Sequence, residues 1–173
     1  MATIRTATGA DGHRLQDIER LGGEAFRELG MAAIADDEPF TEDELARFRN
    51  DGHSWVIVDD TDVPMGYLVV DVVDGNLHVE QVTVDPAYAG RGLGAALIEH
   101  ADAYAAAHRH PALTLTTFTE VAWNAPYYRR LGFRDMTAAE IGPELGAVRR
   151  AEAEHGLDRW PRVCMIRPVR KSS

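Results

Sequence analysis

Residues 78–108 place a strand pattern, a glycine-rich turn and a helical pattern in direct succession. Branched residues recur from Val79 to Val84 and stop at Asp85-Pro86, which predicts a strand. Three glycines then alternate with Arg91 and Leu93, and apolar residues follow every three or four positions, as in an amphipathic helix. Glycine lets backbone N–H groups approach an anion closely, and a helix N-terminus adds donors that lack partners. The succession therefore predicts a phosphate-binding turn.

The glycine spacing alone leaves the phosphate ligand open. No Lys-Ser or Lys-Thr pair follows the glycines, which excludes a Walker A loop. A dinucleotide fingerprint counted from Gly92 has Leu97 at its third glycine position, and one counted from Gly90 has Ala95, which some variants allow. A nicotinamide- or flavin-binding enzyme stays open as an alternative. So does a tight turn that merely needs positive φ.

Two motifs carry a resemblance to a known family. The residues Val82-x-Val84-x-Pro86, followed by Gly90-Arg91-Gly92-Leu93-Gly94, resemble motif A of the GNAT family of N-acetyltransferases. About thirty residues downstream, the stretch from Asn124 to Phe133 (NAPYYRRLGF) resembles its motif B, and the two motifs come in the family's order. The resemblance covers roughly residues 3–168.

The resemblance implies a fold and a cofactor. The fold would be a mixed α/β (α+β) domain with a central twisted sheet of about six or seven strands flanked by helices. Two parallel strands would splay apart around the central cofactor helix, and their edges, at residues 82–84 and 115–117, would bind the pantetheine arm of acetyl-CoA. The first loop position is Ala89, where the family has Gln or Arg. The implied cofactor-binding residues are Val82, Thr83, Val84, Ala89, Gly90, Arg91, Gly92, Leu93, Gly94, Ala95, Asn124 and Tyr128.

Acetyl transfer to an amine needs a base for the ammonium proton and an acid for the leaving thiolate. Glu80 is the candidate base, because alternation places it beside Val82 and Val84 in a strand expected to be central, where burial raises a carboxyl pKa. A salt-bridged, edge-facing Glu80 is the alternative, and Glu24 is a second candidate base. The resemblance makes Tyr128 the acid, although a core aromatic is possible. Asn124 is also predicted to cap a helix.

The amine acceptor is expected to be a small cationic molecule. The chain has a formal net charge of −10, which suits a cationic partner and argues against nucleic acid. By the resemblance, the region between the first two helices lines the acceptor side. Peptide N-termini and protein lysines stay open, as does an acyl-CoA-binding sensor without turnover. The candidate acceptor-binding residues are Glu24, Asp36, Asp37 and Glu38.

The remaining pattern predicts one domain over residues 1–173. Strands are expected at 3–6, 54–58, 65–73, 77–84, 112–118 and 163–169, with a further one starting at Phe133. Asp74-Gly75-Asn76 is a hairpin turn signal between the third and fourth of these strands. Helices are expected from Asp11 to Leu29, at 41–50 with a Thr41/Glu44 capping box, after the glycine turn, at 124–131 and over most of 138–157. A meander that feeds a strand–helix unit implies a mixed sheet, and the strands on either side of the central helix should run parallel.

Composition bounds the setting of the protein. No run approaches the roughly 18 apolar residues of a membrane span, and the N-terminus lacks the apolar segment of a signal peptide. A single cysteine, Cys164, excludes an internal disulfide and is expected to be a buried, inert thiol. The close pair His108 and His110 lacks supporting ligands, so no metal is expected. We expect a cytoplasmic monomer or homodimer.

Overall fold

The computed structural model describes residues 2–170, and the tail at 171–173, predicted to be frayed, lies outside them. The described residues form two compact units. The first comprises the chain up to Asp71 together with Glu80–Glu99, and the second comprises Val72–Val79 and the chain from His100 onward. That the whole chain is one domain stays a prediction.

Seven strands lie within the described residues, hydrogen-bonded in the order β1-β2-β3-β4-β5-β7-β6. The pairs β1–β2, β2–β3, β5–β7 and β6–β7 are antiparallel, and β4–β5 is parallel, so the predicted mixed sheet is confirmed. The long strands agree with the predicted ranges to within one residue. The strands are β1 (Thr3–Thr6), β2 (Ser54–Val58), β3 (Pro64–Val73), β4 (Asn76–Val84), β5 (Ala112–Phe118), β6 (Arg134–Asp135) and β7 (Arg162–Pro168).

Helices lie in the connections β1–β2, β4–β5, β5–β6 and β6–β7, and the structure departs from the prediction in two places. The short helix at 32–35 was not predicted. The helix expected to reach Leu29 ends at Glu24, and a 3₁₀ segment continues to Gly30, whose φ is 76°. Leu21 and Leu29 are 45% and 49% exposed, so the apolar spacing over-predicted their burial. The helices are α1 (Gly12–Glu24), α2 (Ala32–Ala35), α3 (Glu42–Asn50), α4 (Leu93–Ala107), α5 (Ala125–Arg130) and α6 (Pro143–Glu154).

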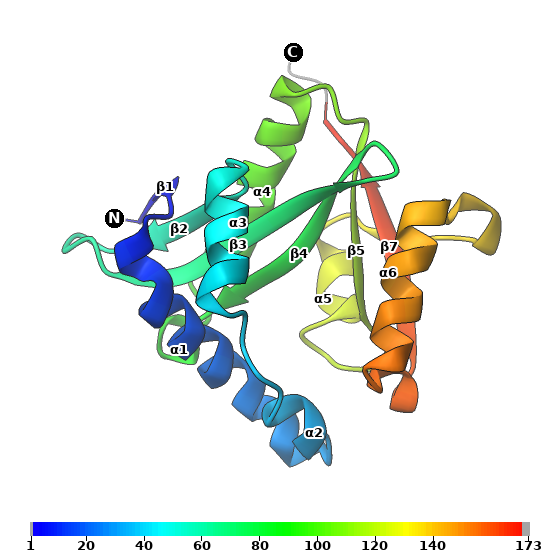
Figure 1. Ribbon diagram of the computed structural model, residues 1–173, viewed down its shortest axis with the longest axis horizontal. Coiled ribbons are helices and arrows are strands. Elements are labelled where there is room, and N and C mark those ends of the chain that lie inside the picture. The colour runs from blue at the N-terminus through cyan, green and yellow to red at the C-terminus, as the bar shows by residue number, and fades with distance from the viewer. Residues whose placement is uncertain (1, 171–173) are drawn as a thin grey trace. The chain divides into compact units, whose positions relative to one another are not determined.

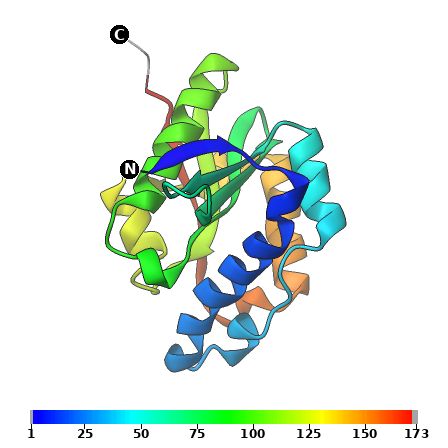
Figure 2. The ribbon, with the colours of Figure 1, turned by 90° about the vertical axis from the view of Figure 1, so that its left-hand side faces the viewer.

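The core of the first unit lies between two helices and two strands. Figures 1 and 2 show α1 and α3 on one face of β2 and β3. The predicted capping box starts α3, because the Thr41 hydroxyl accepts from the Glu44 N–H at 3.1 Å and the Glu44 carboxylate accepts from the Thr41 N–H at 3.0 Å. The buried cluster consists of Leu15, Ile18, Leu45, Phe48, Val56, Val58, Tyr67 and Val69.

In the second unit, the β3–β4 turn also holds the start of α6. Asp74 and Gly75 have φ values of 52° and 80°, as the predicted tight hairpin requires. The Asp74 carboxylate accepts from the N–H groups of Glu144 and Leu145, both at 3.0 Å, so it caps α6. Leu145 then packs against Val73 and Cys164 in a small buried cluster.

A buried ion pair fixes the short helix α5 in the same unit. The Arg167 guanidinium donates to the Asp102 carboxylate at 2.9 Å and to the Leu131 carbonyl at 3.0 Å. Only 4% of the Arg167 side chain and 8% of the Asp102 side chain are exposed. The pair thus ties β7 and α4 to the end of α5.

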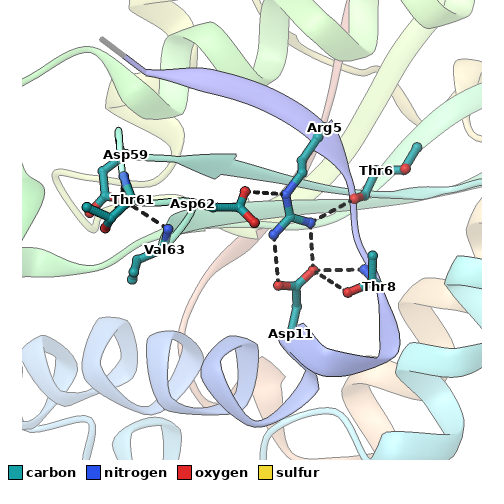
Figure 3. A network of polar contacts seen from close by, with 8 residues as sticks. All are labelled: Arg5, Thr6, Thr8, Asp11, Asp59, Thr61, Asp62 and Val63. Atoms are coloured by element: carbon teal, nitrogen blue, oxygen red, sulfur yellow. Dashed lines mark hydrogen bonds and ion pairs between the residues drawn. The ribbon is translucent and has the colours of Figure 1, made fainter.

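A polar network joins the N-terminal edge strand to the first helix (Figure 3). The Arg5 guanidinium binds both carboxylate oxygens of Asp11, at 2.9 and 3.1 Å, and the exposed Asp62 at 2.8 Å. Asp11 also accepts from the Thr8 N–H at 2.8 Å. Burial by itself raises the pKa of Asp11, but the Arg5 and Thr8 hydrogen bonds outweigh burial and hold that pKa below its ordinary value.

Asp11→Asn should lower the free energy of unfolding by about 2 kcal/mol at pH 7, because Arg5 loses a buried charged partner. Folding lowers the pKa of Asp11, so this contribution is complete above the unfolded pKa and disappears as the pH falls through the folded value. The difference in unfolding free energy between Asp11→Asn and wild type, measured by urea unfolding, should therefore become smaller below about pH 4.

Asp62→Asn is the matched control, because it removes an exposed carboxylate from the same guanidinium. It should cost under about 0.5 kcal/mol. Equal losses of unfolding free energy in the two variants would contradict the inference that burial of the Asp11 carboxylate makes its ion pair the stronger one.

Candidate functional site

The glycine-rich turn has the backbone geometry of an anion cradle. Gly90 and Gly92 have φ values of 79° and 73°, and α4 begins at the next residue, Leu93. A Cβ on either glycine would meet no atom within 4 Å, so glycine is needed for the conformation and not for space. The Ala96 N–H donates to the Gly92 carbonyl at 3.0 Å, which starts the helical pattern. The N–H groups just before it belong to the first turn, where a helix offers no acceptors of its own.

The segment that leads into the turn is fixed by Asp85. Its carboxylate accepts from the Ala87 N–H at 2.9 Å and pairs with Arg14 of α1 at 2.7 Å. Burial raises the pKa of Asp85, but these two partners lower it further, so the carboxylate is charged at neutral pH. Beyond it, the exposed Arg91 guanidinium lies 5.2 Å from the centre of the Tyr88 ring. Arg91 is thus positioned at the surface beside the cradle.

Strand β4 presents different side chains on its two faces. Thr83 faces α1, since its methyl carbon lies 2.7 Å from the position of a Cβ on Gly22. Val84 points the other way, where its Cγ2 lies 3.2 Å from the position of a Cβ on Gly66, beside Ile57. By alternation Glu80 shares the Val84 face, and its side chain is half-buried.

Tyr128 and Asn124, the motif B candidates, lie in the second unit. The half-buried Tyr128 ring packs edge-to-face on Phe133 and Tyr127, with centroids 5.8 and 5.4 Å apart. Burial, and secondarily the neighbouring Tyr127, raises the pKa of Tyr128, so the phenol keeps its proton at neutral pH. Asn124 is the N-cap residue of α5, as predicted, but its side chain makes no cap hydrogen bond. Its Oδ1 instead accepts from the Phe118 N–H of β5 at 3.4 Å.

The sequence from residue 15 to residue 133 matches the family model described as the acetyltransferase (GNAT) family. This match spans more than half of the chain and includes both motifs. The chain belongs to the acetyltransferase (GNAT) family. The resemblance read from the two motifs is therefore confirmed.

Individual acetyltransferases resemble the chain in sequence and fold. The peptidyl-lysine N-acetyltransferase YjaB of Salmonella typhimurium is 28% identical over 142 residues, which cover 82% of this chain and 89% of that protein. The ribosomal-protein-S18-alanine N-acetyltransferase of Escherichia coli has a TM-score of 0.68 at 18% identity, covering 100% and 97% of the two chains. The PaiA N-acetyltransferase of Thermoplasma acidophilum, solved with coenzyme A, has a TM-score of 0.70 at 11% identity, covering 97% and 99%. The two structures support the predicted fold.

Two of the four acidic residues predicted for the acceptor, Glu24 and Asp36, bind the same arginine. Arg27 binds Glu24 at 2.6 Å and Asp36 at 2.5 Å, and its hydrogen bonds lower the pKa of both carboxyls. Asp37 accepts from the Glu38 N–H at 3.1 Å. All four acidic side chains are exposed, so the cluster is a solvated, partly neutralised surface.

The sequence analysis missed a half-buried carboxyl on α1, Glu19. Its side chain accepts from the Phe40 N–H at 2.8 Å and is hydrogen-bonded to the buried Tyr67 hydroxyl. Burial raises the pKa of Glu19 to about 7, even though these two hydrogen bonds oppose the rise. The signal was present, since position 19 is four residues after Leu15 and falls within the apolar stripe of the helix.

The two histidines and the cysteine considered in the sequence have structural surroundings that explain them. The rings of His108 and His110 meet the carbonyls of Tyr104 and Gly75, each at 2.9 Å. Cys164 is buried, as predicted, and burial raises the pKa of its thiol. Residues 2–170 contain no cluster of three or more side chains suited to a metal, and every helix among them falls short of what a membrane crossing requires.

Proposed function

We propose that this acetyltransferase transfers the acetyl group of acetyl-CoA directly to a primary amine in a ternary complex. The observation that carries the proposal is the pair of left-handed residues, Gly90 and Gly92, that leads straight into α4. The N–H groups from there to Ala95 suit a pyrophosphate. Acetyl-CoA would supply the thioester that the amine attacks.

Two side chains have separate proton-transfer roles in this proposal. Glu80 takes the proton of the amine, and Tyr128 donates a proton to the departing thiolate. Burial raises the pKa of the Tyr128 phenol, so Tyr128 is protonated at neutral pH, as a proton donor must be. Main-chain groups of residues 82–84 bind the pantetheine arm as a neighbouring strand would. Asn124 supports the coenzyme through the backbone of β5.

The acceptor in this proposal is a cationic primary amine. The net charge of −10 favours a cation, and a small amine remains the first candidate. A lysine side chain of a peptide is the second candidate, because the similar YjaB protein is named a peptidyl-lysine N-acetyltransferase. Arg27 between Glu24 and Asp36 weakens the case for the acidic loop as the amine site. A cytoplasmic location and a monomeric or dimeric state also stay predictions.

A thiol-release assay with acetyl-CoA tests the function. The amine panel contains polyamines, amino acids, aminoglycosides and lysine-containing peptides, the last with free or blocked N-termini. Turnover with blocked lysine peptides alone would assign the peptidyl-lysine acceptor, and turnover with polyamines the small-amine acceptor. Calorimetric binding of acetyl-CoA without turnover would favour a sensor, and absence of binding would overturn the proposal.

Glu80→Gln and Tyr128→Phe should each lower kcat by about 100-fold, because each removes one proton transfer. The dissociation constant of acetyl-CoA, measured by calorimetry, should change by less than about twofold, since neither change touches the glycine turn. The Glu80 effect should shrink at high pH, where the amine arrives already deprotonated. Unchanged kcat in both variants would contradict the assigned roles.

Gly92→Ala should weaken acetyl-CoA binding by about tenfold, because it disfavours the left-handed backbone that aims the N–H groups at the pyrophosphate. Gly30→Ala is the matched control, since Gly30 has a φ of 76° and equally open surroundings but lies far along the chain from the turn. Both variants should lose about 1 kcal/mol of unfolding free energy. Equal weakening of acetyl-CoA binding in both would show that the loss is not local to the turn.

A further inference from the structure

Strand β5 of the second unit has one hydrogen-bonded neighbour along its second half. Its ladder to β4 ends where His78 meets Thr114, whereas its ladder to β7 continues until Phe118 meets Arg162. Beyond Thr114, one edge of β5 is therefore open, because no strand of the described chain pairs with it there. The residues at 115–117, which the family resemblance assigns to the pantetheine arm, lie along this open edge.

Alternation along β5 identifies the main-chain groups on this open edge. The Thr119 N–H points toward β7, because it donates to the Pro161 carbonyl at 2.9 Å. Successive N–H groups of a strand point to opposite sides, so those of Thr116 and Phe118 point away from β7. The Asn124 side chain covers the Phe118 N–H, with its Oδ1 at 3.4 Å. Thr116 is thus the residue whose N–H and C=O an extended ligand can meet as a neighbouring strand would.

The Thr116 side chain is held by charged residues of α6 and β7, which lie beside each other in the second unit (Figure 1). Its hydroxyl donates to the Glu152 carboxylate at 2.5 Å and accepts from the Arg162 guanidinium at 3.1 Å. Arg162 also binds the same carboxylate oxygen of Glu152 at 3.1 Å, and Arg149 binds the other oxygen at 2.8 Å. The hydroxyl therefore uses its one donor and accepts in return, which fixes the side chain and the backbone that carries it.

The Arg162 guanidinium is buried under unfavourable conditions. Only 7% of its side chain is exposed, and its buried Nε has no hydrogen-bond partner within residues 2–170. Burial lowers the pKa of Arg162, and the charge of Glu152 opposes that effect. The guanidinium also lies 4.5 Å from the centre of the Phe118 ring, so it contacts β5 at two alternate residues of the open stretch. Since a buried charge with an unmade hydrogen bond adds little stability, the network suits fixing one arrangement of β5 better than strengthening the fold.

This inference rests on the proposed function and deepens its account of coenzyme binding. We propose that Glu152 and Arg162 are positioning residues for the coenzyme: through the Thr116 hydroxyl they hold the open edge of β5 so that the Thr116 N–H and C=O meet an amide of the pantetheine arm. Each amide of that arm carries one donor and one acceptor, so a strand residue with both groups available is its chemical complement. Neither Glu152 nor Arg162 was among the residues predicted from the sequence.

Calorimetry of the full chain with two ligands provides the first test. ADP carries the pyrophosphate of the coenzyme without the pantetheine arm, so its binding does not depend on β5. Thr116→Val removes the hydroxyl but keeps the shape of the side chain, and it should raise the dissociation constant of acetyl-CoA by about tenfold while that of ADP changes by less than about twofold. Thr116→Ser keeps the hydroxyl and should restore wild-type binding of acetyl-CoA. Equal weakening of both ligands, or unchanged acetyl-CoA binding in Thr116→Val, would overturn the inference and leave the proposed function standing.

A matched pair of variants tests the positioning residues themselves. Glu152→Gln removes the charge that holds Arg162 and Arg149, and it should raise the KM for acetyl-CoA by about fivefold with the KM for the amine within about twofold of wild type. Asp158→Asn is the control, because it removes an exposed carboxylate from the same Arg149 and leaves the Thr116 hydroxyl bonds in place. Equal effects of the two changes on the KM for acetyl-CoA would overturn the inference. Circular dichroism identifies a variant that fails to fold, and Thr116→Val then carries the test in place of Glu152→Gln.

A third readout locates the contact and is independent of turnover. In ¹⁵N NMR spectra of wild type, the Thr116 backbone amide should shift on titration with acetyl-CoA and stay in place on titration with ADP. A Thr116 amide that does not respond to acetyl-CoA, in a protein that binds it, would overturn this inference alone. Absence of acetyl-CoA binding in wild type would overturn the proposed function and this inference with it.

Discussion

Backbone hydrogen bonds join β4 to β5 where Leu77 meets Leu113 and His78 meets Thr114, and both strands continue past the end of that parallel register. Buried N–H and C=O groups need partners, so a strand whose ladder ends early offers them to something else. In β4, the five residues 80–84 are half-buried, on both faces of the strand. They carry Glu80 on one face and Gln81 and Thr83 on the other, and they precede the glycine turn. In the proposed function, this segment supplies the candidate base and the main-chain groups for the pantetheine arm.

The second unit depends on a charge pair in a comparable way. Helix α5 has six residues, too few to be stable in isolation. Arg167 holds the carbonyl at its end while Asp102 neutralises the buried guanidinium. The orientation of Tyr128 is therefore inherited from β7 and α4 more than from its own helix. A polar interaction that contributes little net stability can still decide where an aromatic hydroxyl points.

Sequence reasoning succeeded where the determining contacts are local. The Thr41/Glu44 box and the Asp74-Gly75 turn each involve residues within a few positions, and both appear as predicted. Glu19 and Tyr67 are far apart in the sequence, and a pattern of apolar spacing carries no information about such a partner. Asn124 shows the limit of such local signals, because it holds the N-cap position of α5 while its side chain accepts from the Phe118 N–H of β5 and not from the helix. Leu21 shows that periodicity predicts a helix face but not how far the neighbouring sheet extends beneath it.

The burial of Cys164 has a practical consequence for measurement. It is the chain's only cysteine, it is 6% exposed, and burial raises the pKa of its thiol, so little of it is the reactive thiolate. A disulfide reagent that releases a coloured product on reaction with thiols, such as an aromatic dithiobis compound, should therefore react very little with the protein itself. The colour that develops in a thiol-release assay then reports free coenzyme. The Cys164 thiol also gives a single, slowly labelled site, and its labelling rate measures how often β7 opens.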